Sequence, residues 1–294
     1  MATVVITGCS SGIGLESALA FARLGDQVYA TMRNEEKATA LLLRAKQEQL
    51  RINIKQLDVT QPDSFASLFS EIIAASGCID VLVNNAGILH PGAFEDLPER
   101  ILREVMETNF WGPMLLTRAV LPHMRKQNGG YIVMISSLSG IAGLAGDVAY
   151  SASKFALEGA TEALRHEIDR WGIHVALVQG GQFDTNIFNR TTRLPEYYPL
   201  HSPYLAMLQN SPPFSKHALT NALPAKIMAE LLPGITKSDG SQLRWSTDDL
   251  AAKVLAALHG QNDAERDKFL RGVSDKDWWS HGHNAPNSTD IESH

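Results

Sequence analysis

A tyrosine and a lysine four residues apart carry the most informative chemistry in this sequence. Tyr150 and Lys154 stand in the stretch Tyr-Ser-Ala-Ser-Lys, and on a helix this spacing puts both side chains on one face. A lysine beside a phenol favours the phenolate, so it is expected to lower the pKa of Tyr150 from about 10 toward neutrality. Tyr150 is therefore a candidate general acid or base, and Lys154 could also hold a ribose hydroxyl. By spacing alone such a pair is usually an exposed surface pair, so a catalytic role is indicated only if other functional motifs accompany it.

Two more polar residues, Ser137 and Asn109, are candidates for the same catalytic site. Ser137 lies just past an apolar run, where its hydroxyl could donate a hydrogen bond to a substrate oxygen, while Ser136 and Ser139 could serve only the turn. Asn109 stands four residues before Pro113, which has no N–H for the Asn109 carbonyl. The freed carbonyl could hold a water that carries protons to Lys154, although a plain proline kink explains the same residues equally well.

A glycine-rich segment near the start of the chain is typical of a phosphate-binding loop. It reads Thr-Gly-Cys-Ser-Ser-Gly-Ile-Gly over residues 7–14, directly after a short apolar run and before a helical pattern. Glycines let the backbone approach a pyrophosphate, and a helix N-terminus attracts its charge. The alternative is an ordinary strand-to-helix turn. The expected contacts with a dinucleotide are Gly8, Ser10, Ser11, Gly12, Ile13 and Gly14.

The choice of dinucleotide is decided at the end of the second apolar run. NAD sites usually place an acidic residue there to bind the ribose 2′-hydroxyl. This chain has Met32 at that position and Arg33 directly after it. A missing carboxylate and an adjacent guanidinium suit a 2′-phosphate, so the sequence favours NADP(H) over NAD(H). The alternative is that Arg33 is a solvated charge at a helix start.

The third and fourth apolar runs end in further candidate contacts. Asp58 could accept a hydrogen bond from an adenine amino group, cap a helix that begins near Pro62, or do both. The motif Asn84–Gly87 follows the next run, where its amides could tie strands together or line the cleft. The expected cofactor contacts here are Asp58, Val59, Asn85, Ala86 and Gly87.

These motifs need strands that end at one edge of a parallel sheet. Short runs rich in Val, Ile and Leu alternate with helix-length segments such as Ile13–Leu24, which predicts repeated β-α-β units with helices on both faces. The fold class is an α/β, Rossmann-like doubly wound sheet, mainly parallel and seven-stranded. The predicted strands are Ala2–Thr7, Gln27–Thr31, Ile52–Leu57, Ile79–Asn84, Tyr131–Ser136 and Ile173–Gln179, with Phe269–Val273 as a possible last one.

Composition limits the remaining classes of protein. The 294 residues carry a net charge of −6, which argues against nucleic-acid binding as the main function. Two cysteines, Cys9 and Cys78, cannot build a disulfide framework or a cysteine zinc site. The start MATVVITG has no signal-peptide pattern, and no apolar run reaches about 18 residues, so a cytoplasmic protein without a membrane span is expected. No metal is expected, because the histidines near the end of the chain, His281, His283 and His294, read as solvated.

Taken together, these residues resemble the short-chain dehydrogenase/reductase family. The matching pieces are the loop of residues 7–14, Asp58, the Asn-Asn-Ala-Gly motif, Asn109, Ser137, and the Tyr150–Lys154 pair. The resemblance covers residues 2–190, with a weaker likeness near Trp245–His259. The stretches Val-Tyr-Ala-Thr-Met-Arg-Asn and Tyr-Ser-Ala-Ser-Lys-Phe-Ala-Leu-Glu-Gly are similar to the branch with 17β-hydroxysteroid and retinol dehydrogenases, which is weakly diagnostic of substrate.

The resemblance implies an Asn109-Ser137-Tyr150-Lys154 tetrad that interconverts an alcohol with a ketone or aldehyde. Tyr150 would exchange a proton with the substrate oxygen, Ser137 would position it, Lys154 would lower the pKa of Tyr150 and bind the nicotinamide ribose, and Asn109 would hold the relay water. Gly181 and Thr185 would meet the nicotinamide carboxamide, but Gly180 replaces the family's usual proline and could make this loop more flexible. A homodimer or homotetramer, built from the helices that carry Asn109 and Tyr150, is also implied.

The excess length is expected to select the substrate. One domain should cover residues 1–280 with a substrate lid at about 186–240, followed by a polar, flexible tail at 281–294. The lid's aromatic and apolar residues could wall a pocket for a lipophilic or aromatic substrate, or simply pack on the core or on a second subunit. The named substrate candidates are Leu138, Leu144, Gln182, Phe188 and Tyr204. Two other functions share the motifs: a non-catalytic NADP(H)-binding regulatory protein, and a dehydratase or epimerase.

Overall fold

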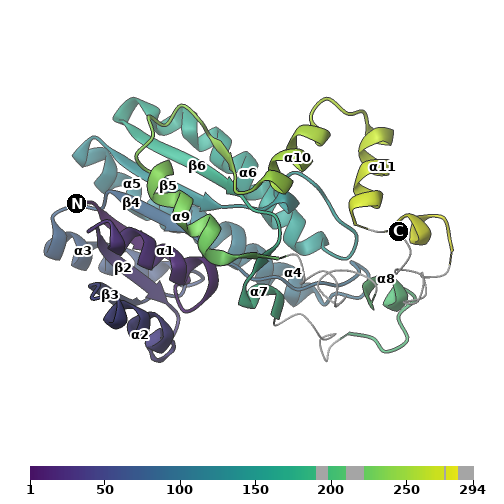
Figure 1. Cartoon of the computed structure of the whole chain (residues 1–294), viewed down its shortest axis with the longest axis horizontal. Helices are drawn as coiled ribbons and strands as arrows, with labels where there is room; N and C mark the ends of the chain where they lie inside the picture. The colour runs from purple at the N-terminus through teal and green to yellow at the C-terminus, as the bar shows by residue number, and fades with distance from the viewer. Residues whose placement is uncertain (190–197, 210–221, 275, 284–294) are drawn as a thin grey trace.

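The predicted apolar runs form one parallel sheet in a computed structural model that describes residues 1–189, 198–209, 222–274 and 276–283. Within the described residues the strand order is β3-β2-β1-β4-β5-β6-β9, and each neighbouring pair is parallel (Figure 1). This arrangement confirms the predicted fold class. The strands are β1 Thr3–Ile6, β2 Gln27–Met32, β3 Ile52–Gln56, β4 Val81–Asn84, β5 Gly130–Ile135, β6 Ile173–Gln179 and β9 Arg244–Ser246.

Helices cover both faces of this sheet, which explains why its central strands are continuously apolar. Successive side chains of a strand point to opposite faces, so Val4 and Ile6 join one core cluster while Val5 joins the other. The first cluster is completed by α1 Gly12–Arg23, α2 Thr39–Gln47 and α9 Ala225–Ile235. The second is completed by α3 Phe65–Ser76, α5 Gly112–Gln127 and α6 Val148–Ile168.

The seventh strand is not the one expected from the sequence. Phe269–Val273 lies inside α11 Asp263–Val273, so the prediction of a strand there is wrong. A capping box starts this helix: Asn262 Oδ1 accepts the Glu265 N–H at 3.1 Å, and Glu265 Oε2 accepts the Asn262 N–H at 3.0 Å. The place beside β6 is taken by β9, whose three residues include a single apolar side chain and so give no strand signal.

The region expected to form a substrate lid has two kinds of structure. Its described parts are α7 Asn186–Asn189, α8 Leu205–Gln209, the short pair β7 Phe183–Asp184 and β8 Leu223–Pro224, and α9. Helix α9 packs against α1, and its Met228, Leu232 and Ile235 are buried in the core. The expectation of a lid therefore does not hold for residues 225–235; residues 190–197 and 210–221 lie outside the described residues.

Several short helices gather at one end of the sheet. Helix α8 lies there with α10 Asp249–Leu258, α11 and α12 Asp277–Ser280, while α4 Glu99–Met106 packs against α6 (Figure 1). Tyr204, just before α8, lies 6.2 Å from Trp279 of α12 between ring centres. The last helix of the described chain is thus held against the segment before α8.

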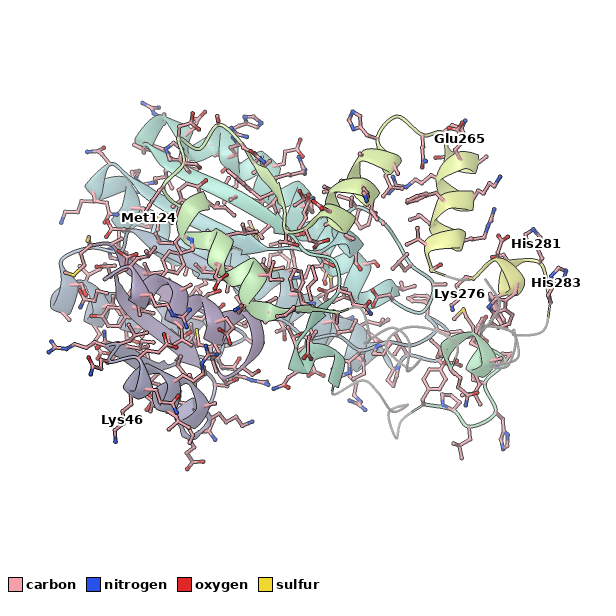
Figure 2. All side chains as sticks on the ribbon, viewed as in Figure 1. Lys46, Met124, Glu265, Lys276, His281 and His283 are labelled. Carbon is pink, nitrogen blue, oxygen red and sulfur yellow. The ribbon has the colours of Figure 1, made fainter. Side chains whose placement is uncertain are left out.

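The expected tail begins with two histidines that lie far from the sheet (Figure 2). The rings of His281 and His283 stack with 5.9 Å between their centres, and His281 Nδ1 lies 2.8 Å from the Asp277 carbonyl oxygen. No group of three possible metal ligands occurs among the described side chains. His294 and the rest of the tail from residue 284 lie outside the described residues.

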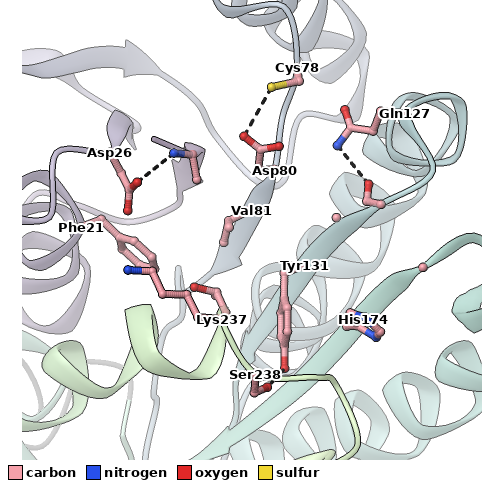
Figure 3. Close-up of a pocket in the computed structure, with 15 residues that line it drawn as sticks. Phe21, Asp26, Cys78, Asp80, Val81, Gln127, Tyr131, His174, Lys237 and Ser238 are labelled. Atoms are coloured by element: carbon pink, nitrogen blue, oxygen red, sulfur yellow. Dashed lines mark hydrogen bonds between the residues drawn. The ribbon is translucent and has the colours of Figure 1, made fainter.

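The amino ends of β1, β4 and β5 surround a cavity of about 360 Å³ (Figure 3). Its carboxylates are already used within the fold: Asp26 Oδ1 accepts the Ala2 N–H at 2.8 Å, and Asp80 Oδ2 accepts the Thr3 N–H at 2.7 Å. Ligands of open α/β sheets bind at the carboxyl ends of the strands, which is the opposite edge. This cavity is therefore separate from the residues that could do chemistry.

The two-sided core makes a direct prediction about stability. Leu82 of β4 is fully buried, so Leu82→Ala should lower the free energy of unfolding by about 2–5 kcal/mol through lost burial and a cavity. Leu42→Ala is the matched control, because Leu42 of α2 is 46% exposed and should cost no more than about 0.5 kcal/mol. Urea unfolding followed by circular dichroism measures both, and equal losses would contradict this description of the core.

Candidate active site

The loops after β1 and β4 are joined at the point where the strand order reverses. Thr7 Oγ1 accepts the backbone N–H groups of Asn85 and Ala86, both at 2.9 Å. In return, Asn85 Nδ2 donates to the Thr7 carbonyl oxygen at 2.7 Å and to that of Gly8 at 3.3 Å. Asn85 and Ala86 thus hold the glycine loop in place, at the edge where ligands of such sheets bind.

The glycine loop has a shape that a side chain would destroy. Gly8 and Gly12 adopt positive φ angles of 73° and 57°. A Cβ on Gly14 would lie 2.4 Å from the Gly8 oxygen and 2.5 Å from Asn85 Nδ2. Ser11 precedes α1 in an extended conformation and makes no side-chain capping bond. The first N–H groups of α1 therefore lack a side-chain cap, and with the tight backbone they fit a pyrophosphate.

Around this loop, the remaining predicted contacts line the same edge. Ser10 is partly exposed in the loop itself, and Ile13 is partly buried against the first core cluster. Gly87 lies beside Asn109, whose Oδ1 would be 3.4 Å from a Cβ at that position. The structure therefore brings the Asn-Asn-Ala-Gly motif between the glycine loop and Asn109.

The end of β2 presents a cation and no carboxylate. Met32 is 3% exposed and belongs to the core, so its side chain is not available to a ribose. Arg33 is exposed directly after it, and its carbonyl oxygen accepts a hydrogen bond from Gln56 Nε2 at 3.1 Å. This bond fixes the backbone and leaves the guanidinium at the surface.

Asp58 makes a local turn rather than a helix cap. Its Oδ1 accepts the Thr60 N–H at 2.9 Å and the Thr60 hydroxyl at 2.8 Å. The short helix at Pro62 begins after Gln61, so the capping alternative is wrong. Val59 is buried, and its carbonyl oxygen would lie 2.9 Å from a Cβ on Gly112, so this segment packs closely on the start of α5.

Ser137, Tyr150 and Lys154 meet at the carboxyl end of β5. Ser137 follows the strand by two residues, and its side chain is hydrogen bonded to the Tyr150 hydroxyl. Lys154 lies one turn after Tyr150 on α6, with its Nζ 5.6 Å from the centre of the tyrosine ring. The same Nζ donates to the carbonyl oxygen of Ile135 at 2.8 Å. One strand end and one helix therefore position all three groups.

The pKa values of Tyr150 and Lys154 are shifted mainly by burial. Burial raises the pKa of Tyr150, the charge of Asp147 adds to the rise, and the hydrogen bond with Ser137 opposes it. The expectation that Lys154 lowers the pKa of Tyr150 is therefore wrong for this arrangement, in which the Lys154 ammonium is turned to the Ile135 carbonyl. Burial lowers the pKa of Lys154 to about 8, against the attraction of Glu158.

Asn109 sits in a π-helical turn, Glu107–Trp111, between α4 and α5. Its side chain makes two hydrogen bonds with the loop after β4. Oδ1 accepts the Ile88 N–H at 2.9 Å, and Nδ2 donates to the Ile88 carbonyl at 2.8 Å. Nδ2 also donates to Ser153 Oγ of α6 at 3.1 Å. The visible role of this buried amide is to join the loop to the helix that carries Tyr150.

The loop after β6 lies against the glycine loop. A Cβ on Gly12 would be 3.3 Å from Thr185 Cβ, which places Thr185 directly beside the glycine loop. Gly181 is close to Leu138 and Asp248. Gly180, which stands where the family has proline, is buried, and a Cβ there would lie 2.3 Å from Met228 Cε of α9. A methionine side chain thus fills the room that a proline ring would need.

The five substrate candidates do not form one wall. Leu138 packs toward α10, and the Gln182 carbonyl accepts the Leu223 N–H at 3.0 Å. Leu144 is partly exposed in the loop before α6. Tyr204 turns away, because its hydroxyl donates to Glu95 Oε2 at 2.7 Å and its ring meets Trp279. The side chain of Phe188 lies outside the described residues.

Sequence reasoning missed two acidic residues on α6. Glu158 is 4% exposed, and its Oε1 accepts from Ser136 Oγ at 2.6 Å and from Gln179 Nε2 at 2.9 Å. Its Oε2 accepts from Arg244 Nε at 3.0 Å. Asp147 stands at the N-terminal end of the same helix, bonded to Ser139. Their positions, four residues after Lys154 and three before Tyr150, were the only signal in the sequence.

Comparisons with known proteins agree with this geometry. The family model described as short chain dehydrogenase matches residues 2–194. Retinol dehydrogenase 8 of Bos taurus is 41% identical over 61% of this chain, and the match spans 58% of that protein's length.

Solved structures extend the likeness to nearly the whole chain. A short-chain dehydrogenase from Streptomyces avermitilis is 30% identical with a TM-score of 0.75, covering 96% of this chain and 97% of its own. A metagenomic short-chain oxidoreductase, solved in complex with NADP, is 26% identical with a TM-score of 0.65, covering 83% and 95%. No described helix is long and apolar enough to span a membrane. With its glycine loop, parallel sheet and matched family model, the chain belongs to the short-chain dehydrogenase/reductase family of oxidoreductases.

Proposed function

We propose that the protein is an NADP(H)-dependent oxidoreductase that interconverts a secondary alcohol and a ketone, or a primary alcohol and an aldehyde. The observation that carries this proposal is that Ser137, Tyr150 and Lys154 lie together at the carboxyl-terminal edge of the sheet. The glycine loop lies at the same edge. The buried Lys154 amine and the partly buried hydroxyl groups of Ser137 and Tyr150 lie close to a pyrophosphate cradle, which suits proton exchange with a substrate oxygen next to a nicotinamide.

In this mechanism the protein binds, orients and moves the proton. The nicotinamide cofactor, when bound, supplies or accepts the hydride. Ser137 donates a hydrogen bond to the substrate oxygen, and Tyr150 gives it a proton during reduction. Because burial keeps the pKa of Tyr150 above its usual value, the phenol is protonated at neutral pH and is ready for reduction. Alcohol oxidation needs the phenolate, so its rate should rise with pH.

Removing the phenol hydroxyl tests this role. Tyr150→Phe should retain cofactor binding and lose at least about 100-fold in kcat, because general acid–base catalysis supplies that much or more. Cofactor fluorescence titration and turnover on a panel of ketones and alcohols measure the two effects. Substantial activity in the variant would sink the mechanism, whereas loss of both binding and turnover would point to misfolding.

Arg33 is our candidate for the 2′-phosphate contact. It is an exposed cation at the end of β2, where the carboxylate typical of NAD sites is absent, and one solved relative contains NADP. Arg33→Glu should reduce kcat/KM for NADPH by about 10- to 100-fold, the worth of a charge-assisted hydrogen bond, and leave NADH little changed.

Lys46→Glu is the matched control, because Lys46 is an exposed cation on α2 (Figure 2). It makes the same change of charge and should leave the ratio of NADPH to NADH activity unchanged. Similar losses in both variants would mean that net charge, rather than Arg33 itself, favours NADPH.

Two other functions predict different products. A dehydratase or epimerase on this fold would leave no net NADPH or NADP⁺, and a non-catalytic regulatory protein would bind the cofactor without turnover. The proposed alcohol–ketone reaction changes the nicotinamide absorbance in proportion to product. The lipophilic class of substrate is supported by the likeness to a retinol dehydrogenase, so retinoid and other lipid alcohols belong in the panel.

We also propose that the protein forms a homo-oligomer through the segments that carry Asn109 and Tyr150. Trp111 of the π-helical turn and Phe155 of α6 are 46% and 44% exposed, and these two segments pack together. Large apolar side chains exposed near each other favour association. Trp111→Lys and Phe155→Lys should therefore shift the sedimentation coefficient toward the monomer, while Leu24→Lys at the exposed C-cap of α1 should not. A parent protein that sediments as a monomer contradicts the proposal.

A further inference from the structure

We propose that Asp147 is a positioning residue, which holds the turn of Ser137 against α6 and controls how readily Tyr150 releases its proton. The inference rests on the proposed function, because it concerns the same pair of hydroxyl groups. It adds a residue outside the Asn-Ser-Tyr-Lys group, and the physical grounds are the bonds, the enclosure and the charge of this carboxyl group.

Asp147 reaches the serine through one intermediate residue. Its Oδ2 accepts a hydrogen bond from Ser139 Oγ at 3.3 Å. The backbone N–H of Ser139 donates to Ser137 Oγ at 3.1 Å. Asp147 therefore holds Ser139 in place, and Ser139 orients the Ser137 hydroxyl. Ser137 is in turn hydrogen bonded to Tyr150.

This use of an aspartate at the start of a helix is unusual. Asp147 occupies the N-cap position of α6, where a carboxylate normally accepts N–H groups of the first turn. Its side chain makes no such bond here. The carboxyl group bonds to Ser139 instead of the N–H groups of the first turn. It therefore stabilises the turn that carries Ser137 and leaves the start of α6 without a side-chain cap.

The second carboxyl oxygen is enclosed and has no partner among the described residues. Although Asp147 as a residue is only partly buried, its Oδ1 is shielded from solvent and no hydrogen bond to it is found. An unpaired buried oxygen destabilises the fold, so this carboxyl group is placed here at a cost to stability.

No ion pair with Asp147 is found among the described residues, and no cation contributes to the shift of its pKa. Ser139 bonds to this carboxyl group, the backbone of Gly92 pairs with the backbone of Asp147, and Leu208 of α8 packs on Gly146 beside it. On its own helix the titratable neighbour is Tyr150, because Lys154 is turned to the Ile135 carbonyl. A negative charge on Asp147 therefore acts on Tyr150 without being neutralised.

The consequence depends on pH. Burial raises the pKa of Asp147 from 3.8 to about 7, with the Ser139 hydrogen bond opposing the rise. Above that pH the carboxylate is charged and holds the proton on Tyr150, which favours the acid form needed for reduction. Below it the carboxyl is neutral and this influence disappears.

Asp147→Asn tests the proposal, because an amide keeps the shape and can still bond to Ser139 but carries no charge. The ionisation of Tyr150 should shift down by about one pH unit. The chain has six tyrosines, so the shift is read from the ultraviolet titration of each protein minus that of the same protein with Tyr150→Phe. The pH profile of alcohol oxidation should move down with it, while kcat at its plateau changes little.

Glu167→Gln is the matched control, since it removes the same charge from an exposed position of α6 and should shift neither curve. Asp147→Ala additionally breaks the bond to Ser139 and should lower kcat more than it changes KM. An unshifted phenol titration in Asp147→Asn overturns the proposal. Because that titration needs no turnover, the result is separate from the outcome of the proposed function.

Thermal stability gives a second readout that shows whether the variant folds. The native state holds a proton on Asp147 that the unfolded chain releases, between pH 3.8 and about 7. The free energy of unfolding should therefore fall as pH rises through this window. Asp147→Asn should lessen this fall, and an identical pH dependence of the melting temperature would argue against an enclosed, titrating carboxyl.

Discussion

A buried carboxylate organises the end of the sheet where the chemistry is proposed. Glu158 of α6 accepts hydrogen bonds from Ser136 after β5, from Gln179 at the end of β6, and from Arg244 in β9. A charge out of water is costly unless it is paired and fully bonded, so these partners have little freedom to move. The same helix carries Tyr150 and Lys154, and Glu158 therefore fixes the strand ends relative to both.

The periodic parts of the fold could be predicted, because buried parallel strands and their helices leave a strong apolar pattern. The strands that were predicted from Val, Ile and Leu runs start and end within about two residues of the observed bounds. β9 could not be predicted, since its three residues carry one apolar side chain and its strand geometry comes from pairing with β6. The segment Phe269–Val273, predicted as a strand from its apolar residues, is helical because it belongs to α11, which a capping box starts.

Motifs predicted which residues meet, but not how they share protons and bonds. The spacing of Tyr150 and Lys154 indicated a common helix, yet the orientation of the lysine toward the Ile135 carbonyl depends on the end of β5. Asn85 is predicted to contact the cofactor, and the structure adds that its side chain fastens the glycine loop. Asp147 and Glu158 gave no motif, because their partners come from segments distant in sequence or from a turn.

The packing of α9 on α1 has a consequence for the growing chain. Six strands of the sheet are complete by residue 179, whereas the helix that covers part of the α1 side spans residues 225–235. Chains are made from the N-terminus, so that apolar surface stays uncovered while roughly 50 more residues are synthesised, and exposed surface of this kind invites aggregation. A chain that stopped at residue 194, where the family match ends, would keep the same surface open permanently.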